Sequence, residues 1–245
     1  MLDSLFSVVG KNNLRFALKK SNISIFKTIR FNFIAFPFSQ AIKFPFLIGR
    51  HVEIRGIGKI LVKCPIEPCA FTIGVLFNSG WESKKESRTV FYNEGVLELN
   101  GYWSAYSGSK IYIKNNACLS FMGYNLIGNK SKIICYNNIK FGSDTNLSWE
   151  CEVMDSNFHN LKDLVSGKIQ KREAPIEIGN GVFIGNNVSI HKGTKIPNGC
   201  VISSFSRVAG SFKKEGENLL IVGNPAKIID SGFKMLMKNF KDYEE

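Results

Sequence analysis

Aliphatic side chains recur at every sixth position through the C-terminal third of the chain, and small or apolar side chains follow four positions after them. Turn-forming residues lie between these positions in the same phase. Because Asn and Gly adopt left-handed backbone conformations at low cost, each six-residue unit predicts a short strand followed by a corner. The sixth-position series is Ile178, Ile184, Ile190, Ile196, Ile202 and Val208, and the series four positions later is Val182, Val188, Thr194, Cys200 and Ser206. The corners are Asn180-Gly181, Asn186-Asn187, Lys192-Gly193 and Asn198-Gly199.

Three such units make one triangular turn of eighteen residues. This turn stacks Ile178 beneath Ile196 and Ile184 beneath Ile202 at about 4.8 Å, the spacing of hydrogen-bonded strands. A second tract keeps the same period with weaker corners, and before residue 95 no register holds. Its members are Ile127, Ile133, Ile139, Thr145 and Cys151, with corners at Ser131, Asn137, Ser143 and Trp149. The pattern predicts an all-β solenoid, because six consecutive matches with the corners in phase are hard to obtain in a sandwich of unrelated strands.

The period is interrupted between Cys151 and Ile178 by an excursion that we place at residues 156–175. This excursion is polar and charged. Loops that project from a rigid solenoid commonly carry function, so we expect the chemistry of the protein here.

The composition agrees with a solenoid and excludes several other classes of protein. The chain holds 27 Ile, 23 Asn and 22 Gly, which suit an interior ladder with tight corners, and 44% hydrophobic residues exclude a disordered chain. The six cysteines lack CxxC spacing and no secretory signal accompanies them, so we predict neither a zinc finger nor a disulfide scaffold. A reduced cytosolic compartment fits these cysteines best. The longest uncharged run of the apolar N-terminal third, residues 31–42, falls short of the roughly 18–20 residues that cross a bilayer.

The net charge of +12 is concentrated in the first fifty residues, which carry eight basic residues against the single acid Asp3. Phenylalanines are interleaved with these basic residues. Such a segment can lie on an anionic membrane surface or dock on a partner, and its plainer interpretation is a Phe core with a solvated basic rim. No helix-turn-helix, zinc or aromatic RNA-binding signature accompanies the charge, so nucleic acid is not predicted as a partner.

From about residue 97 to residue 230 the chain resembles the hexapeptide-repeat acyltransferases, in particular bacterial sugar and surface-polysaccharide O-acetyltransferases. The resemblance implies a left-handed parallel β-helix, a handedness that composition does not determine. We divide the chain into a basic N-terminal region leading into the first coils (1–95), a β-helix acetyltransferase domain with its inserted loop (96–230), and a short amphipathic C-terminal helix (231–245). In this last segment Phe233, Met237 and Phe240 recur at helical spacing among lysines.

The string Asp155-Ser-Asn-Phe-His159 is similar to the Asp-x-Asp-x-His loop of these O-acetyltransferases, whose His is the general base; Asn157 stands where the family has its second acid. The resemblance implies that His159 takes a proton from a sugar hydroxyl as that hydroxyl attacks a thioester carbonyl. An imidazole titrates near pH 6.5 and is substantially neutral at cellular pH. Asp155 would orient the imidazole, bind the acceptor or cap the loop.

The string Gly223-Asn-Pro-Ala-Lys227 is similar to the segment that closes the acetyl-coenzyme A site in this family. The resemblance implies that the pantetheine arm lies between neighbouring subunits against the coil corners, and that lysines face the nucleotide phosphates. Arg207 either contacts a phosphate or points to solvent; residues 204–208 depart from the family's Ala-Gly-Ser-Val-Val. The implied binding residues are Gly185, Ser203, Ser204, Arg207, Lys213, Lys214, Pro225 and Lys227.

The sequence and the resemblance together predict a cytosolic homotrimer, placed near the inner membrane, that acetylates a sugar hydroxyl of a bacterial capsule, O-antigen or other surface polysaccharide with acetyl-coenzyme A. One alternative is N-acetylation of an amino sugar nucleotide. Another is a non-catalytic scaffold docked on a membrane through residues 1–50. A zinc carbonic anhydrase of the same fold is excluded, because His51, His159 and His191 have neither the spacing nor the shared coil of three zinc ligands, and no metal site is predicted. His191 is expected to line the outer face of a coil, and His51 is assigned no role. The sugar, the hydroxyl position and the length of the acyl donor stay open.

Overall fold

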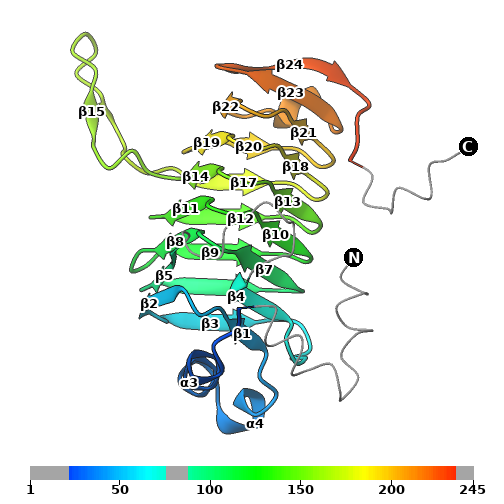
Figure 1. The fold of residues 1–245 in the computed structure, drawn as a ribbon. Coiled ribbons are helices and arrows are strands. Elements are labelled where there is room, and N and C mark those ends of the chain that lie inside the picture. Colours follow the sequence, from blue (N-terminus) through cyan, green and yellow to red (C-terminus); the bar gives the residue numbers. More distant parts are fainter. Residues whose placement is uncertain (1–21, 76–87, 236–245) are drawn as a thin grey trace, which may run out of the picture.

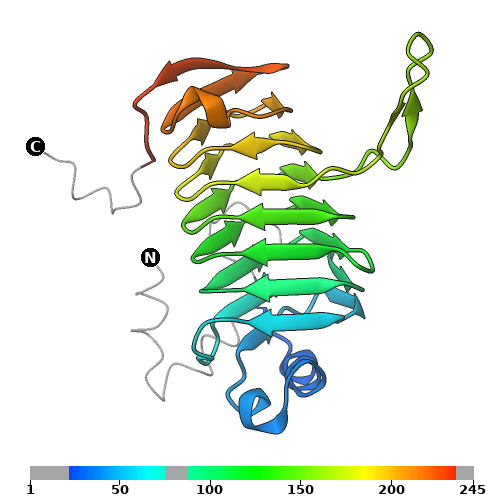
Figure 2. The ribbon, with the colours of Figure 1, turned by 180° about the vertical axis from the view of Figure 1, so that it is seen from behind.

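The computed structural model describes residues 22–75 and 88–235. The chain winds around one axis as a parallel β-helix (Figures 1 and 2). Each complete coil adds one strand to each of three sheets, so strands that pair lie one coil apart and run parallel. At the upper end β24 reverses direction and pairs antiparallel with β23.

Three sheets form the faces of the β-helix, and we number them in the order in which a coil visits them. Sheet 1 contains β1 (Phe46–Ile48), β4 (Phe71–Val75), β7 (Trp103–Tyr106), β10 (Asn125–Ile127), β13 (Thr145–Leu147), β18 (Phe183–Ile184), β21 (Val201–Ile202), β23 (Leu219–Gly223) and β24 (Ala226–Ser231). Sheet 2 contains β2 (Val52–Gly56), β5 (Thr89–Asn93), β8 (Lys110–Ile113), β11 (Lys132–Cys135), β14 (Glu152–Met154), β19 (Ser189–His191) and β22 (Arg207–Val208). Sheet 3 contains β3 (Lys59–Val62), β6 (Val96–Leu99), β9 (Cys118–Phe121), β12 (Asn138–Phe141), β17 (Ile176–Ile178) and β20 (Lys195–Ile196).

The upper coils have the predicted ladder and the predicted corners. Ile178 pairs with Ile196, Ile184 with Ile202, and Ile190 with Val208, and all of these side chains are buried. The side chains four positions later in each unit are buried as well. The second residue of each predicted corner has a left-handed φ, at Gly181, Asn187, Gly193 and Gly199. The hexad therefore places apolar side chains inside and turn residues at the vertices.

The β-helix begins at Phe46, well before the predicted boundary at residue 96, so the region assigned to 1–95 contains coils of its own. These coils keep no six-residue period because each is longer than eighteen residues: Phe46 pairs with Phe71, twenty-five positions further on. Aromatic rings fill part of their interior, next to the buried Ile48 and Ile73. The Phe46 and Phe71 rings are 4.9 Å apart, and higher in the β-helix the Phe121 and Phe141 rings are stacked at the same distance.

The tract from residue 127 to 151 is buried as predicted, but its left-handed residues lie one position away from three of the four predicted corners. Asn125 pairs with Thr145, twenty positions on, so Ile127 is stacked under Leu147 rather than under Thr145. The left-handed positions are Lys130, Asp144 and Glu150. The longer coil explains why the hexad drifts here.

Helix α3 (Ile25–Ala35) covers the lower end of sheet 1, with α4 (Phe38–Ala41) following it (Figure 1). An edge strand leaves backbone groups unpaired, and buried polar side chains of α3 satisfy those of β1. The Asn32 amide accepts from the Phe46 N–H at 3.0 Å and donates to the Phe46 carbonyl at 2.9 Å, and the Thr28 hydroxyl accepts from Ile48 N–H at 3.0 Å. The Phe31 ring packs on Phe46 at 4.9 Å. The first described residues thus form a cap on the β-helix.

The hairpin of β23 and β24 closes the upper end, after a short 3₁₀ turn, η1 (Lys213–Glu215). The C-terminal helix predicted for residues 231–245 falls mostly outside the described residues; Ser231 ends β24 and residues 232–235 are not helical. No helix among the described residues has the length and apolar character to span a membrane.

Candidate functional site

The excursion predicted at residues 156–175 leaves the β-helix after β14 and returns into β17, at the corner between sheet 2 and sheet 3. It forms an antiparallel hairpin of β15 (Leu161–Lys162) and β16 (Ile169–Gln170) that projects away from the coils (Figures 1 and 2). Ser156 and Glu173 pair as an antiparallel bridge at its base. We call residues 156–175, which interrupt the six-residue repeat, the arm; the Ser156–Glu173 bridge joins its two strands where they leave the coils.

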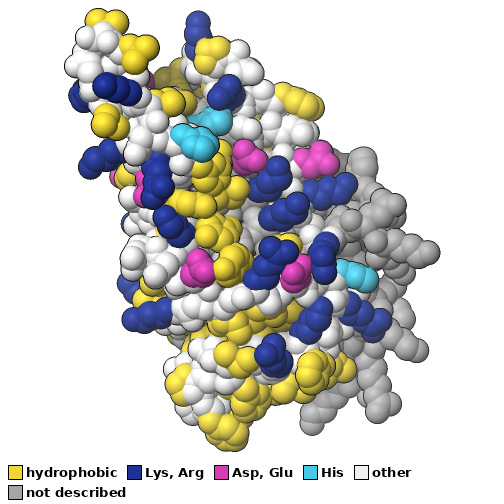
Figure 3. Space-filling view, turned by 90° about the vertical axis from the view of Figure 1, so that its left-hand side faces the viewer, with side chains coloured by type: hydrophobic (Ala, Val, Ile, Leu, Met, Phe, Trp, Pro, Cys, Tyr) yellow, Lys and Arg dark blue, Asp and Glu magenta, His cyan; other side chains and the backbone are white. Residues whose placement is uncertain are grey.

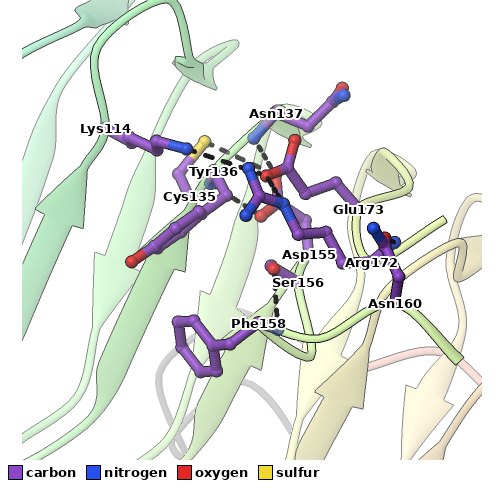
Figure 4. A network of polar contacts seen from close by, with 10 residues as sticks. All are labelled: Lys114, Cys135, Tyr136, Asn137, Asp155, Ser156, Phe158, Asn160, Arg172 and Glu173. Atoms are coloured by element: carbon purple, nitrogen blue, oxygen red, sulfur yellow. Dashed lines mark hydrogen bonds and ion pairs between the residues drawn. The ribbon is translucent and has the colours of Figure 1, made fainter.

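Asp155 anchors the strand that enters this arm. Its side chain is fully buried, and its two carboxylate oxygens accept the backbone N–H groups of Tyr136 and Asn137 at 2.7 and 2.9 Å (Figure 4). Burial raises the pKa of this carboxyl above its usual value, and these N–H groups oppose that rise. The carboxylate therefore ties the arm to the corner one coil below, and its hydrogen bonds go to that corner and to Cys135 rather than to His159.

A second set of contacts holds the returning strand of the arm. Glu173 Oε1 lies 3.0 Å from Arg172 Nε and 3.9 Å from Lys114 Nζ. The Phe158 ring meets the Tyr136 ring edge-on at 5.2 Å. Figure 4 shows these side chains gathered where the arm leaves the coils. Both ends of the arm are thus attached to the corners beneath it.

His159 is exposed and lies at the start of the arm, just beyond this anchored base. Phe158, which precedes it, has a left-handed φ of 64° and donates its N–H to the Ser156 hydroxyl at 3.0 Å. A bulky residue rarely adopts this conformation. The local turn is therefore constrained, and it leaves the imidazole accessible to a bound molecule.

The tip of the arm carries exposed apolar side chains that the sequence argument missed, because it took the whole excursion as polar. Leu164 is 89% exposed and Val165 is 100% exposed, and Leu161 and Ile169 are more than half exposed. The available signal was the isolated Leu-Val pair at 164–165 in a charged segment. Large apolar groups held out in solvent are typical of a surface that contacts another protein.

His191 lies on the outer face of sheet 2, as predicted, and is in contact with Arg207 one coil above. Arg207 Nε donates to His191 Nε2 at 3.0 Å. Burial, and then the Arg207 charge, lower the pKa of His191 below its usual value. This contact holds the Arg207 side chain along the outer face of sheet 2. A phosphate contact of Arg207 stays a prediction.

Four of the predicted coenzyme A residues meet at the corner between sheet 1 and sheet 2. A Cβ on Gly185 would lie 2.7 Å from the Ser204 nitrogen, so the stacking of the coils by itself requires glycine there. Ser203 donates its N–H to the Ile221 carbonyl at 2.9 Å, and Gly223 N–H donates to Ser206 Oγ at 3.0 Å. This second bond brings the turn with the cis Asn224–Pro225 peptide to the same corner.

The three predicted lysines have different surroundings. Lys213 and Lys195 both pair with Glu177 on sheet 3 and lower the pKa of that carboxyl to about 2. Lys214 and Lys227 are exposed, and neither pairs with a carboxylate among the residues of 22–75 and 88–235. Of the three predicted lysines, Lys214 and Lys227 are therefore the two that have no carboxylate partner among the described residues.

Within one chain, the two groups of predicted residues do not meet. The arm with His159 projects from the corner between sheets 2 and 3, whereas Gly185, Ser204 and Pro225 lie at the corner between sheets 1 and 2. The width of sheet 2 separates these corners. The two groups of predicted residues therefore do not form one site within the described part of a single chain.

No group of three or more His, Cys, Asp or Glu side chains suited to a metal ion occurs in the part of the chain that the structure describes.

Comparison with known proteins agrees with the coil geometry. Residues 175–210 match the bacterial transferase hexapeptide family, described as six repeats. The match covers the upper coils, where the six-residue repeat was predicted. The crystal structure of the polySia specific acetyltransferase NeuO superposes with a TM-score of 0.54 at 19% identity, covering 80% of each chain. The left-handed parallel β-helix implied by the resemblance is confirmed.

Two curated relatives of this hexapeptide-repeat chain are named for acetyl transfer. Rv3034c of Mycobacterium tuberculosis, named as an acetyltransferase, is 29% identical in an alignment of 154 positions that covers 57% of this chain and 49% of the relative. WbbJ of Escherichia coli, named as a lipopolysaccharide biosynthesis O-acetyl transferase, is 27% identical in an alignment of 145 positions that covers 56% of this chain and 72% of the relative. The chain thus spans about half the length of the first of these relatives.

Proposed function

We propose that this protein transfers an acetyl group from acetyl-coenzyme A to a sugar hydroxyl of a bacterial surface polysaccharide, with His159 as general base. The observation that carries the proposal is that the His159 imidazole is exposed at the start of the arm. Asp155 fixes this part of the arm to coils that carry the hexapeptide repeat. The names of the curated relatives support acetyl transfer and, for WbbJ, an O-linked product in lipopolysaccharide biosynthesis.

In this mechanism the neutral imidazole of His159 accepts the proton of the acceptor hydroxyl as its oxygen attacks the acyl carbon. Acetyl-coenzyme A supplies an activated thioester with a thiolate leaving group, so the chain needs no nucleophile of its own. Asp155 positions the arm through the backbone of Tyr136 and Asn137 and takes no proton in the reaction. Lys214 and Lys227 supply unpaired positive charge for the nucleotide phosphates.

We further propose a homotrimer in which each site lies between two subunits. The separation of the two corners within one chain supports this arrangement, because the arm of one copy would have to meet the Gly185 corner of its neighbour. The exposed Leu164 and Val165 at the tip support it as well, since contact with a neighbour would remove them from water.

The N-terminal cap supports a peripheral membrane contact on the cytoplasmic side. Phe26 and Phe38 are 75% and 72% exposed, and Arg30 and Lys43 are exposed beside them. No acidic residue occurs between residues 22 and 50, so an anionic lipid surface complements this face in both polarity and charge. The cap lies at the end of the β-helix opposite to the β23–β24 hairpin (Figure 1).

The decisive experiment compares His159→Ala with His51→Ala. Acceptor glycans are first screened by mass spectrometry for acetylation by the intact protein, and release of coenzyme A is then measured with the best acceptor. We expect His159→Ala to lower turnover by about 10²- to 10⁴-fold with an unchanged circular dichroism spectrum, and His51→Ala to retain activity. Equal turnover by both variants would reject His159 as the base. Absence of turnover by the intact protein with every acceptor would favour the scaffold alternative. An acetyl group found on a sugar nitrogen would favour the amino sugar alternative.

A further inference from the structure

A pocket of about 460 Å³ lies under the base of the arm, on the same corner of the β-helix. Two corners one coil apart form its floor, with Lys114, Asn115 and Asn116 from one and Tyr136 and Asn137 from the other. Glu173 of the returning strand lines it as well, and Figure 4 shows its carboxylate joined to Lys114 and Arg172. Its volume is within the range of about 300–1,000 Å³ that is usual for small-molecule sites.

The lining of this pocket suits a polyhydroxylated ligand. Three asparagine amides offer both donors and acceptors, the Lys114 ammonium only donates, and the Glu173 carboxylate accepts. Tyr136 is the aromatic member, and Lys114 Nζ lies 4.8 Å from its ring centroid. No aliphatic side chain lines the pocket. Such a set of groups can pair with hydroxyls on several sides of a sugar ring.

The three charged side chains that meet at the pocket, Lys114, Arg172 and Glu173, leave one positive charge in excess. Glu173 Oε1 is shared by Arg172 Nε at 3.0 Å and Lys114 Nζ at 3.9 Å, so two cations face one carboxylate. The nearby Asp155 carboxylate is buried and taken up by backbone N–H groups. Figure 3 shows that Lys and Arg side chains are spread over the side from which the arm projects. An anionic ligand is therefore favoured over a neutral one.

The pocket is coupled to the arm by direct contact. Tyr136 lines the pocket and packs against Phe158 at 5.2 Å, and His159 is the next residue along the chain. A ligand seated against Tyr136 would thus lie beside the segment that carries the imidazole. We propose that the pocket binds an acidic sugar residue of the acceptor, a proposal that rests on the function proposed above and names the class of its substrate.

The test measures binding directly, by saturation-transfer NMR of the full-length protein with D-glucuronic acid and with D-glucose as its neutral counterpart. We expect glucuronate to bind more tightly than glucose, and Lys114→Gln to weaken glucuronate binding at least fivefold without changing the weaker glucose binding. Lys110→Gln, an exposed lysine at the start of β8 outside the pocket, is the matched control and should bind like the wild type. Thermal unfolding followed by circular dichroism checks that each variant is folded.

The proposal is overturned if the wild type binds neither sugar, if it binds glucose as tightly as glucuronate, or if Lys114→Gln binds glucuronate like the wild type. Because this measurement needs no turnover, its failure is separable from failure of the general base. His159→Ala should lose turnover and still bind glucuronate; a His159→Ala protein that keeps its turnover would reject the base and leave the pocket result to be judged by Lys114→Gln.

Discussion

The Asp155 carboxylate accepts the backbone N–H of Tyr136 at 2.7 Å, and this bond joins the entry of the arm to the corner of the coil below. The same carboxylate accepts the N–H of Asn137 at 2.9 Å. A side chain that was a candidate for chemistry therefore supports the geometry of the segment that carries His159.

Replacing Asp155 by Ala should destabilise the fold and loosen the arm. The change leaves two part-buried backbone N–H groups without their acceptor, at a cost of about 1–3 kcal/mol in the free energy of unfolding. Urea denaturation measures this cost, and hydrogen exchange of the Tyr136 and Asn137 amides reports the local opening. Asp163→Ala is the control, because that carboxylate caps the exposed tip and should have a smaller effect. Equal effects of the two substitutions would contradict the anchoring role.

The pH dependence of stability should show that burial disfavours the charged form of Asp155. Its pKa in the folded protein is raised above 3.8, so the folded state binds the proton more tightly than the unfolded chain does. The contribution of this carboxyl to stability is then fully present below pH 3.8 and is lost as the pH rises through the raised pKa. We expect the unfolding free energy of the wild type, relative to Asp155→Asn, to fall over that window. A relative stability that rises with pH would mean that the two N–H bonds outweigh desolvation.

Arg207 should hold His191 in its neutral form. Substitution Arg207→Gln removes the nearby charge and is expected to raise the pKa of His191, although burial, the larger cause, will keep it below the usual 6.5. NMR titration of the imidazole signals measures this shift, with Arg172→Gln as the control. Since the folded pKa is depressed, the stabilisation by neutral His191 is present above pH 6.5 and is lost as the pH falls through the folded value. An unchanged titration in Arg207→Gln would reject the contact.

The Ile ladder should dominate the stability of the upper coils. Ile184 is fully buried between Leu147 and Ile202, its partners in register. We expect Ile184→Ala to lower the free energy of unfolding by about 2–5 kcal/mol, through lost burial and the cavity that remains. Ile229 lies on β24 and is 61% exposed, so Ile229→Ala should change the free energy of unfolding far less. Denaturant titrations of the two variants would contradict the ladder if their midpoints moved equally.

The cap should bind membranes through its apolar face. We expect the full-length protein to cosediment with phosphatidylglycerol vesicles, less with phosphatidylcholine, and less at high salt. The double substitution Phe26→Ser with Phe38→Ser should abolish cosedimentation, whereas Leu164→Ser with Val165→Ser in the arm should not. Failure of the intact protein to bind phosphatidylglycerol vesicles would reject the proposed membrane contact.

The sequence by itself determined the parts of this protein whose signal is local. The interior of the upper coils, their left-handed corners and the place of the interruption all follow from residues within one or two hexads of each other. Each hexad has a buried aliphatic residue and a turn-forming residue at the same positions, so the coils can be predicted without knowing which strands pair. His159 was chosen as the candidate base because residues 155–159 resemble a loop of the sugar O-acetyltransferases.

Only the tertiary structure decided what the coils bring together. The lower coils have variable corners, so only strand pairing shows that Phe46 lies against Phe71. Asp155 reaches Tyr136, and Arg207 reaches His191, across one coil, a relation that depends on coil length rather than on local sequence. The same stacking creates the pocket at Lys114 and separates the two candidate corners by a sheet face, because side chains far apart in sequence become neighbours only when successive coils close.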